Sequence, residues 1–452
     1  MSAELSTEEL LRAADRVVAT ARSHEQIEVY ISRGTSTEVR VHGGEVEHFV
    51  SAASAGIGIR VIDEKRTGFA HAGTLDADAV AEVLAEAREN VAFGSPDEWA
   101  GLAVPDGVDT IEQSLWSDEL ERFPTAEKIA LAIELERLTL GTDARVRVDE
   151  ANFVDGGGEG VVVTSTGIRR VGRSNSCHVS VSTLANDTDG TRTGFGFAIG
   201  KHPGEFDLER AATEAVDRAT RLLGATKPQS RRTTMVCDPM VTAQILSIIG
   251  GTLSGEAVVR GRSIFGDRLG EMIASPLVSL IDDPTDARAY SASDLDGEGL
   301  AARRNVLIDC GRLHQFVHSS YSARRAGVAT TGNGVRGGYA GSPGAGCLAL
   351  QLVPGEGSQQ ELIAGIDDGV LIQSVSGVHS GVNPVSGDFS VGATGMAIRH
   401  GSIAEPIREF TIASTLQRML TDIVVVGGDI EWLPMRSNGM SLVIADVMVS
   451  GG

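Results

Sequence analysis

The sequence predicts an α+β protein, in which an N-terminal domain of mixed helices and antiparallel strands precedes a β-rich C-terminal domain. Residues 7–21 have the hydrophobic period of a helix, and the residues after them form short runs of strand composition. Residues 225–232 have the composition of a linker. Glycine is frequent, at 55 of 452 residues, which favours turns and strand ends over long helical bundles. We therefore expect domains at 1–228, with lobes at about 1–95 and 120–228, and at 229–452.

Helices and strands alternate along the first domain. The first helix, over 7–21, has Ser6 or Thr7 as its expected cap. Further helices are expected at about 76–92, 125–140 and 206–223, with Asp76 or Asp78 capping the first of these and Thr125 the second. Residues 93–123 are acidic and interrupted by Pro and Gly, which predicts a linker or lid. Strands separated by glycine or charged turns are expected at 26–33, 36–42, 45–53, 55–62, 66–71, 145–155, 159–165, 168–182 and 191–199.

The second domain begins with a predicted strand at 233–237 and a helical region from about 239 to 262. Beyond Ile281 the pattern is mostly β, with glycine punctuation typical of a sandwich or a twisted sheet. Helices are expected at about 358–364 and 410–421. The expected strands are 304–309, 313–318, 347–353, 369–376, 388–399 and 441–448.

Composition argues against several classes of protein. The net charge of −22 and the aromatic content of 4% disfavour binding to nucleic acid or to anionic lipid. No apolar run reaches the length of a transmembrane helix, and the acidic N-terminus lacks the features of a signal peptide, so we expect a cytoplasmic protein. The four cysteines are widely spaced and are expected to be reduced: Cys177, Cys237, Cys310 and Cys347.

The most informative segment is Gly255-Glu-Ala-Val-Val-Arg260, because it has the spacing of a zinc-protease helix without the ligands. A His-Glu-x-x-x-His segment supplies two imidazoles to a metal and a carboxylate that activates water. Here Glu256 stands at the carboxylate position, but Gly255 has no side chain and Arg260 offers only N–H donors. The segment therefore predicts no metal site. An ion pair of Glu256 with Arg260 or Arg262 would be a structural replacement for the metal.

Two other patterns are weaker candidates for sites. Gly332, Gly334 and Gly337 match G-x-G-x-x-G, but no helix can follow them, so a flexible or substrate-facing loop is favoured over a nucleotide site. His314 and His318 are expected on one strand, about 13 Å apart at a strand's rise per residue, which is too far for one metal ion. No complete catalytic constellation emerges from the residues alone.

Several segments together resemble the TldD/PmbA family, in particular its PmbA branch, which is also called TldE. The resemblance covers nearly the whole chain in order. Its N-terminal segments are Glu28-Val-Tyr-Ile, Val39-Arg-Val-His-Gly-Gly-Glu-Val-Glu47, Gly56-Ile-Gly-Ile-Arg-Val61 and Thr67-Gly-Phe-Ala-His71. Its C-terminal segments are Tyr321-Ser-Ala-Arg, Ser374-Val-Ser-Gly-Val-His379, Val382-Asn-Pro-Val-Ser-Gly-Asp-Phe-Ser390, Ile407-Arg-Glu-Phe-Thr-Ile-Ala413 and Val426-Gly-Gly-Asp-Ile-Glu-Trp432.

The resemblance implies a peptidase made of two related subunits that acts on unfolded or modified peptides, including leader peptides. In such a pair the TldD-like subunit holds zinc through the two histidines of His-Glu-x-x-x-His and a cysteine near its C-terminus. This chain departs from that ligand set at Gly255 and Arg260, and no cysteine follows Cys347. We therefore expect a non-catalytic, cofactor-free subunit of a heterodimer, with zinc in the partner. Expected substrate-binding residues are Gly332, Gly334, Gly337 and Asp388.

Two alternatives stay open. One is a homodimeric peptide-binding protein without hydrolase activity. The other is an autonomous hydrolase that uses His314 and His318 with Ser319 or Ser320. The sequence does not identify the peptide substrate or the surface that forms the dimer.

Overall fold

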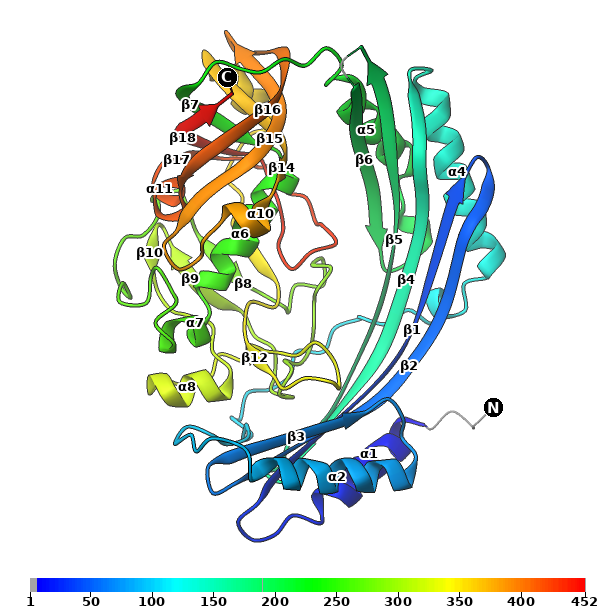
Figure 1. Ribbon diagram of the computed structural model, residues 1–452, viewed down its shortest axis with the longest axis vertical. Coiled ribbons are helices and arrows are strands. Elements are labelled where there is room, and N and C mark those ends of the chain that lie inside the picture. The colour runs from blue at the N-terminus through cyan, green and yellow to red at the C-terminus, as the bar shows by residue number, and fades with distance from the viewer. Residues whose placement is uncertain (1–5, 189, 452) are drawn as a thin grey trace.

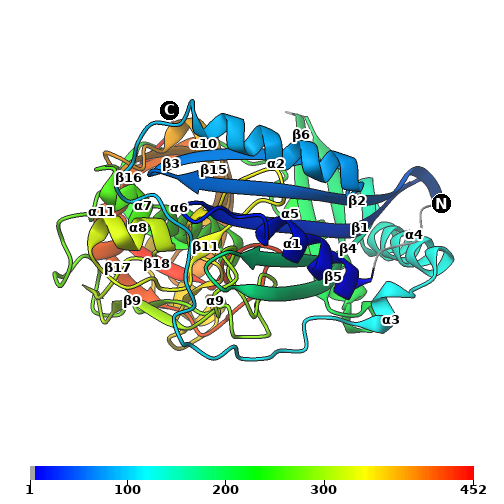
Figure 2. The same cartoon turned by 90° about the horizontal axis from the view of Figure 1, so that it is seen from below.

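The computed structural model describes residues 6–188 and 190–451, and it confirms the predicted α+β class. A long curved sheet lies along one side of the molecule, and the C-terminal half packs against its inner face (Figures 1 and 2). The sheet has the strand order β3-β2-β1-β4-β5-β6, and every neighbouring pair is antiparallel. Its strands are β1 (Gln26–His42), β2 (Glu45–Asp63), β3 (Arg66–Ala72), β4 (Val146–Thr164), β5 (Arg169–Asp187) and β6 (Gly190–Gly200).

Three of these strands are longer than the sequence predicted. The expected breaks at 34–35, 54 and 156–158 are wrong, because β1, β2 and β4 run through them. Gly34 lies inside β1, where a Cβ would stand 2.8 Å from the carbonyl oxygen of Gly157 on β4. Here glycine permits the close approach of two backbones and does not form a turn.

Helices cover the outer face of the sheet. Alternate residues of β1, such as Val29, Ile31 and Val39, are fully buried beneath them, and Glu28 and Tyr30 point to the opposite face. The helices are α1 (Thr7–Val18), α2 (Ala77–Val91), α4 (Thr125–Thr142) and α5 (Leu208–Thr220), and a short 3₁₀ turn, η1 (Pro203–Glu205), precedes α5. The period of two in β1 therefore assigns one face to the N-terminal core and the other to the C-terminal half.

The helix caps differ in part from the prediction. Ser6, one of the two expected caps of α1, is the cap residue, and it forms a capping box with Glu9. Asp76 precedes α2 and Pro124 precedes α4, and neither makes a side-chain cap bond. The expected cap at Thr125 is wrong because the preceding proline already fixes the extended backbone at that end of the helix.

Residues 92–117 form an irregular segment that leads to the short helix α3 (Asp118–Glu121). The segment is tied to the C-terminal half at several points. Gln113 donates to the carbonyl of Pro284 at 3.1 Å, and Asp106 pairs with Arg303 at 2.6 Å. The guanidinium of Arg324 donates to three backbone carbonyls between Trp99 and Leu102. The expected linker is therefore held in place between the two halves.

The C-terminal half is built on a second six-stranded sheet, of order β16-β15-β14-β7-β18-β17. Because β16 also pairs with β18, five of the strands close into a ring around the largest hydrophobic core. Only β7 and β14 are parallel neighbours. The strands are β7 (Arg231–Cys237), β14 (Asp368–Ser376), β15 (Asp388–Arg399), β16 (Ser402–Thr415), β17 (Ile423–Val426) and β18 (Leu442–Ser450).

Smaller elements join this ring to the inner face of the first sheet. A separate four-stranded sheet has the order β10-β9-β8-β13, and β11 and β12 form a hairpin. These strands are β8 (Leu280–Asp282), β9 (Asn305–Asp309), β10 (Arg312–Leu313), β11 (Gly334–Val335), β12 (Gly344–Ala345) and β13 (Leu350–Leu352). The helices are α6 (Pro239–Thr252), α7 (Gly255–Val259), α8 (Ser320–Ala326), α9 (Gln359–Ala364), α10 (Val378–Gly381) and α11 (Leu416–Thr421).

Three predictions for the C-terminal half need correction. The helix expected over 239–262 is divided into α6 and α7. The strand expected over 313–318 is reduced to the two residues of β10, because 314–317 have no continuous strand partner. The helix expected over 410–421 begins only at Leu416, since 402–415 are β16. In the described part of the chain, no helix combines the length and the apolar character needed to cross a membrane.

Candidate functional site

The segment with the spacing of a zinc motif lies on its own short helix, α7. Ser254 is extended and ends the continuity with α6, and its hydroxyl accepts from the N–H of Glu256 at 3.3 Å. The N–H of Gly255 donates to the carbonyl of Val317 at 2.7 Å. Helix α7 is therefore fixed to the strand-like residues that lead into α8.

The first position of the motif has no room for a side chain. Gly255 is buried, and a Cβ there would overlap the imidazole of His318. His318 is 6% exposed, and its Nδ1 lies 3.1 Å from the hydroxyl of Ser322. Burial lowers the pKa of His318, which keeps the ring neutral. A histidine at position 255 cannot be accommodated while the ring of His318 stays where it is.

The other two positions of the motif pair with each other. The guanidinium of Arg260 lies 2.7 Å from Glu256 Oε1, and the second oxygen of that carboxylate accepts from the N–H of Ala345 at 3.4 Å. Side-chain exposure is 47% for Arg260 and 30% for Glu256, so both side chains of the pair are partly exposed. Glu256 thus contacts β12 while it neutralises Arg260.

These residues do not fit a zinc ion. Gly255 offers no donor atom, and a guanidinium has N–H donors but no lone pair for a metal. Over residues 6–188 and 190–451, no group of three or more His, Cys, Asp or Glu side chains is arranged to hold a metal.

A cavity of about 760 Å³ opens beside α7. Its walls come from α6, α7, β12 and the segment before β18. The lining residues are Ser247, Gly250, Gly251, Ser254, Glu256, Ala257, Arg260, Arg262, Ala345, Gly346, Cys347, Leu350, Met435 and Arg436. The cavity is the largest concave feature at the motif.

The glycine-rich segment predicted as a loop forms the β11–β12 hairpin, and its three glycines have different surroundings. Gly332 has φ of 68°, and a Cβ there would lie 2.7 Å from the carbonyl oxygen of Ala301. The N–H of Gly334 donates to Asp296 Oδ2 at 2.8 Å. Gly337 has open space around it. Two of the three expected substrate-binding glycines are therefore packed against the protein, and one faces open space.

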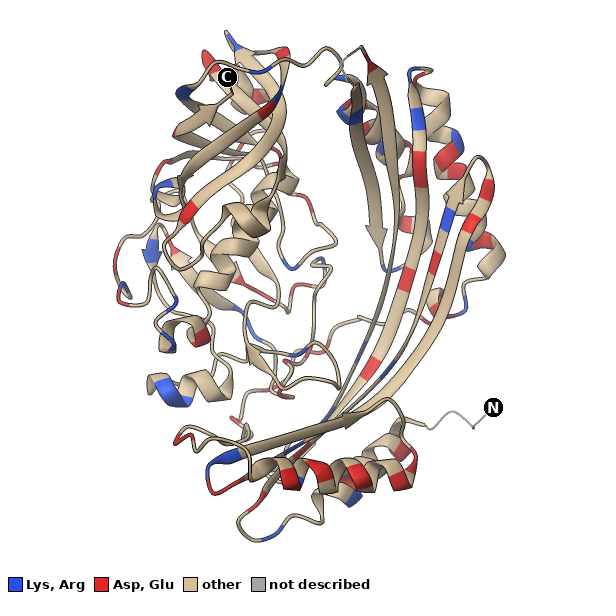
Figure 3. Cartoon of the chain, in the orientation of Figure 1, with Lys and Arg blue, Asp and Glu red and all other residues tan. Residues whose placement is uncertain are grey.

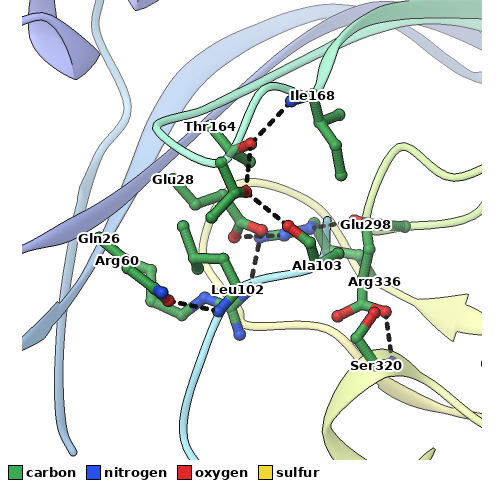
Figure 4. A network of polar contacts seen from close by, with 12 residues as sticks. Gln26, Glu28, Arg60, Leu102, Ala103, Thr164, Ile168, Glu298, Ser320 and Arg336 are labelled. Carbon is green, nitrogen blue, oxygen red and sulfur yellow. Dashed lines mark hydrogen bonds and ion pairs between the residues drawn. The ribbon is translucent and has the colours of Figure 1, made fainter. Parts of the chain in front are cut away.

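The hairpin is anchored to the first sheet by a buried ion cluster (Figure 4). Arg336 lies 2.6 Å from Glu28, whose other oxygen lies 2.8 Å from Arg60. The side chains of Glu28 and Arg336 are only 1% and 2% exposed. Burial raises the pKa of Glu28, but Arg60 and Arg336 outweigh burial and hold the pKa below its usual value. The guanidinium of Arg336 also stacks over Tyr30, 4.5 Å from the ring centroid.

Two further buried carboxylates support the hairpin and α8. Asp296 accepts the N–H groups of Glu298 and Leu300, both at 2.9 Å, besides that of Gly334. Burial, and then the nearby charge of Glu298, raise the pKa of Asp296 to about 7. Glu298 accepts the N–H of Ser320 at 2.7 Å (Figure 4). In the sequence this pair is visible only as the Asp-Gly-Glu-Gly run from 296 to 299, and nothing in that run indicates that both carboxylates are buried.

A cleft of about 470 Å³, separate from the cavity beside α7, lies between the inner face of the first sheet and the C-terminal half. Residues Gly158–Gly160 of β4 line one wall, and residues 290–297 line the facing wall. Gly334 and Val335 of β11, and Arg336 directly after it, also line this cleft. The β11–β12 hairpin therefore stands between the cleft and the cavity beside α7.

The remaining predicted residues lie in separate places. His314 is half-exposed, 3.8 Å from Asp309. The hydroxyl beside His318 is that of the fully buried Ser322, and Ser319 caps α8. Ser320 contacts Glu298 through its N–H. Asp388 is exposed at the start of β15, and its carboxylate accepts from the hydroxyl of Ser386 at 2.6 Å.

Three family models match the chain. They describe PmbA/TldA metallopeptidase domain 1 over residues 27–91, the central domain over 118–223 and the C-terminal domain over 230–451. Among curated relatives, the metalloprotease PmbA of Escherichia coli O157:H7 is 27% identical over 438 residues, which cover 94% of this chain and 92% of that protein. A metalloprotease TldD homolog of Buchnera aphidicola subsp. Schizaphis graminum is 26% identical, with coverage of 83% and 80%.

Two solved structures share the fold. TldE from Thermococcus kodakarensis superposes with a TM-score of 0.87 at 23% identity, covering 98% of this chain and 99% of that chain. A Thermotoga maritima protein, described as a candidate modulator of DNA gyrase, gives a TM-score of 0.89 at 24% identity, covering 98% and 100%. The family models span most of the sequence, and the relatives match both halves. The chain therefore belongs to the PmbA/TldD family of metallopeptidases.

Proposed function

We propose that this chain is the non-catalytic, PmbA/TldE-like subunit of a two-protein zinc peptidase. Zinc and the catalytic carboxylate belong to a TldD-like partner, and the pair acts in the cytoplasm on unfolded or modified peptides. The observation that carries the proposal is that neither Gly255 nor Arg260 on the α7 segment can serve as a metal ligand. Gly255 lies beneath His318, and Arg260 is paired with Glu256, so neither position of the motif can ligate a metal.

The cysteine content supports the same role. The last cysteine of the chain, Cys347, is partly buried beside α6, with its Sγ 3.8 Å from the carbonyl oxygen of Gly250. Burial, and then the charge of Asp282, raise the pKa of Cys347 well above its usual value, which disfavours the thiolate that a metal requires. This chain therefore has no counterpart of the third zinc ligand expected in the partner.

The cleft and the family support the proposed substrate class. The cleft is lined by backbone-rich segments of β4 and β11, and such surfaces recognise an extended peptide through main-chain groups with little regard for sequence. In this proposal residues 1–228 and 229–452 act as the two domains whose facing surfaces hold the peptide. Gly337, between β11 and β12, has open space around its backbone. Asp388 lies at the start of β15, in the ring of strands of the C-terminal half.

The test is reconstitution. Zinc content and cleavage of an unfolded peptide are measured for this protein alone, for a TldD-like protein from the same source, and for the two mixed. The proposal predicts no bound zinc and no cleavage alone, with activity in the mixture exceeding that of the partner. A Glu256→Gln variant is expected to support the mixture as well as the wild type.

Stoichiometric zinc in the lone chain, or turnover without a partner, would contradict the proposal. Peptide binding without any gain of activity in the mixture would instead identify a homodimeric peptide-binding protein. Size measurements of the mixture separate that outcome from a failure to associate.

A further inference from the structure

The cavity beside α7 has an unusual balance of charge. Three arginines line it, Arg260, Arg262 and Arg436, against the single carboxylate of Glu256. Glu256 is already paired with Arg260. Within the described residues, the side chains of Arg262 and Arg436 have no hydrogen bond or ion pair. Two arginines that have no carboxylate partner among the described residues therefore line this cavity.

This arrangement contrasts with the rest of the molecule. The chain has 61 acidic residues against 39 basic ones, and acidic side chains are prominent along α2 and the long strands (Figure 3). Most arginines of this chain have carboxylate partners close by, such as Arg33, Arg88 and Arg192. In an acidic protein, unpaired arginines at a concave surface indicate a place for an external anion.

The rest of the lining fits an organic anion better than an inorganic one. Between the arginines, the wall is formed by Leu350, Met435, Ala257 and the thiol of Cys347, with bare backbone at Gly250 and Gly251. A concave site with apolar walls and a few convergent polar groups is the usual form of a site for an organic ligand. Here an apolar side chain can lie beside a charged group.

The cavity also communicates with the cleft. Arg436 lines both of them. The hairpin forms the partition, because Val335 faces the cleft while Ala345 and Gly346 face the cavity. Arg436 therefore lies where the cleft and the cavity meet.

We propose that this cavity binds a carboxylate of the peptide substrate through Arg262 and Arg436. The inference rests on the proposed function, since it specifies a chemical group of the same substrate. Guanidinium groups suit this task because they keep their charge and present paired N–H donors to a carboxylate. The carboxylate comes from the peptide's C-terminus or from an acidic side chain.

The test measures peptide binding by the full chain alone, with fluorescence anisotropy and three versions of one labelled unfolded peptide. The first ends in a free carboxylate, the second in an amide, and the third is an amide with an aspartate near its end. We expect the first or third to bind at least about fivefold more tightly than the plain amide. The version that does so identifies the source of the carboxylate.

Variants then locate the effect. In the Arg262→Gln/Arg436→Gln protein the preference for a carboxylate should disappear, with binding of the amide unchanged. The control, Arg16→Gln, removes an exposed arginine on α1, far along the chain from the cavity. Circular dichroism shows that each variant is folded.

Three results would overturn the inference. These are equal binding of all peptides, a preference that survives in the double variant, and no binding of any peptide. None of them affects the reconstitution test, in which activity depends on the partner. Conversely, the lone chain could prefer peptides with a carboxylate while the mixture with the TldD-like protein gains no activity. That result would support the carboxylate site and contradict the proposal of a two-protein peptidase.

Discussion

At the scale of single residues, the contact between Gly255 and His318 determines what the motif can hold. The sequence was enough to recognise Gly255 and Arg260 as non-ligands, because that judgement needs only the chemistry of the two side chains. It could not place His318 over Gly255, since the contact depends on how α7 docks on the residues before α8. The sequence predicted instead that His318 lies on a strand.

A Gly255→Ala substitution should destabilise the protein by about 2 kcal/mol, because the added methyl group overlaps a buried ring in a packed interior. Urea unfolding measures the change. The control is Gly251→Ala, where helix α6 leaves open space and alanine is expected to be neutral or slightly stabilising. Combining Gly255→Ala with His318→Ala should recover part of the loss, and strictly additive effects would refute the proposed contact.

The pair of Glu256 and Arg260 should contribute little to stability. Both side chains are partly exposed, and such pairs contribute at most about 1 kcal/mol. Glu256→Gln should therefore lower the free energy of unfolding by less than about 1 kcal/mol. Glu214→Gln is the matched control, because Glu214 pairs with Arg210 at the same spacing and the same 2.7 Å distance. A loss several times larger at Glu256 would mean that the pair replaces the metal structurally.

At the scale of elements, glycine and local bulges explain most differences between prediction and structure. The expected breaks in β1 and β4 fall at glycines whose neighbours lie across the sheet, and a sequence does not show that neighbour. In β16, Ile407 and Phe410 are both buried although they are three residues apart. Glu409 between them has φ of 51°, and the register with β15 shifts there. Because of this bulge, buried residues in β16 are three positions apart, which is the hydrophobic spacing expected of a helix.

The β11–β12 hairpin should depend on its buried anchor. Arg336→Met leaves Glu28 buried with one counter-charge fewer, which should cost about 3 kcal/mol or more. Hydrogen exchange should accelerate across the hairpin more than in α1. The double variant Glu28→Gln/Arg336→Met removes the uncompensated carboxylate and should regain part of the stability. Unchanged exchange in the single variant would show that the hairpin is held by other contacts.

At the scale of the whole molecule, the sequence indicated the α+β class and the order of elements, but not how the halves meet. The cluster of Glu28 and Arg336 joins residues that are 308 positions apart in the sequence, and no local pattern predicts it. Another junction lies where α5 meets the loop after β17. There Arg218 stacks on Phe195, 4.2 Å from the ring centroid, and lies 3.5 Å from Asp238. Glu431, in the loop after β17, lies at this junction, close enough to feel the charges of Asp238 and Arg218.

Glu431 should make stability depend on pH. Burial, and then the charges of Asp238 and Glu214, raise its pKa to about 7. Because the folded pKa exceeds the unfolded one, the neutral form is favoured in the fold, and its contribution is lost as pH rises through about 7. Glu431→Gln should therefore stabilise the protein relative to wild type by on the order of 2 kcal/mol at pH 8, with a smaller gain at pH 5.

Urea unfolding of both proteins at the two pH values measures this difference. The exposed Glu356 provides the control, because Glu356→Gln makes the same chemical change at the surface, away from this junction. A gain at Glu431 that does not vary with pH would refute the titration and point to packing alone.

The imidazole over Gly255 also limits how such a chain could change over generations. A histidine at position 255 meets the ring of His318, and a histidine at position 260 has no second ligand beside it. Neither single step gives a metal site on which selection could act. Metal binding at α7 would need several coordinated substitutions, so no single change in the sequence creates it.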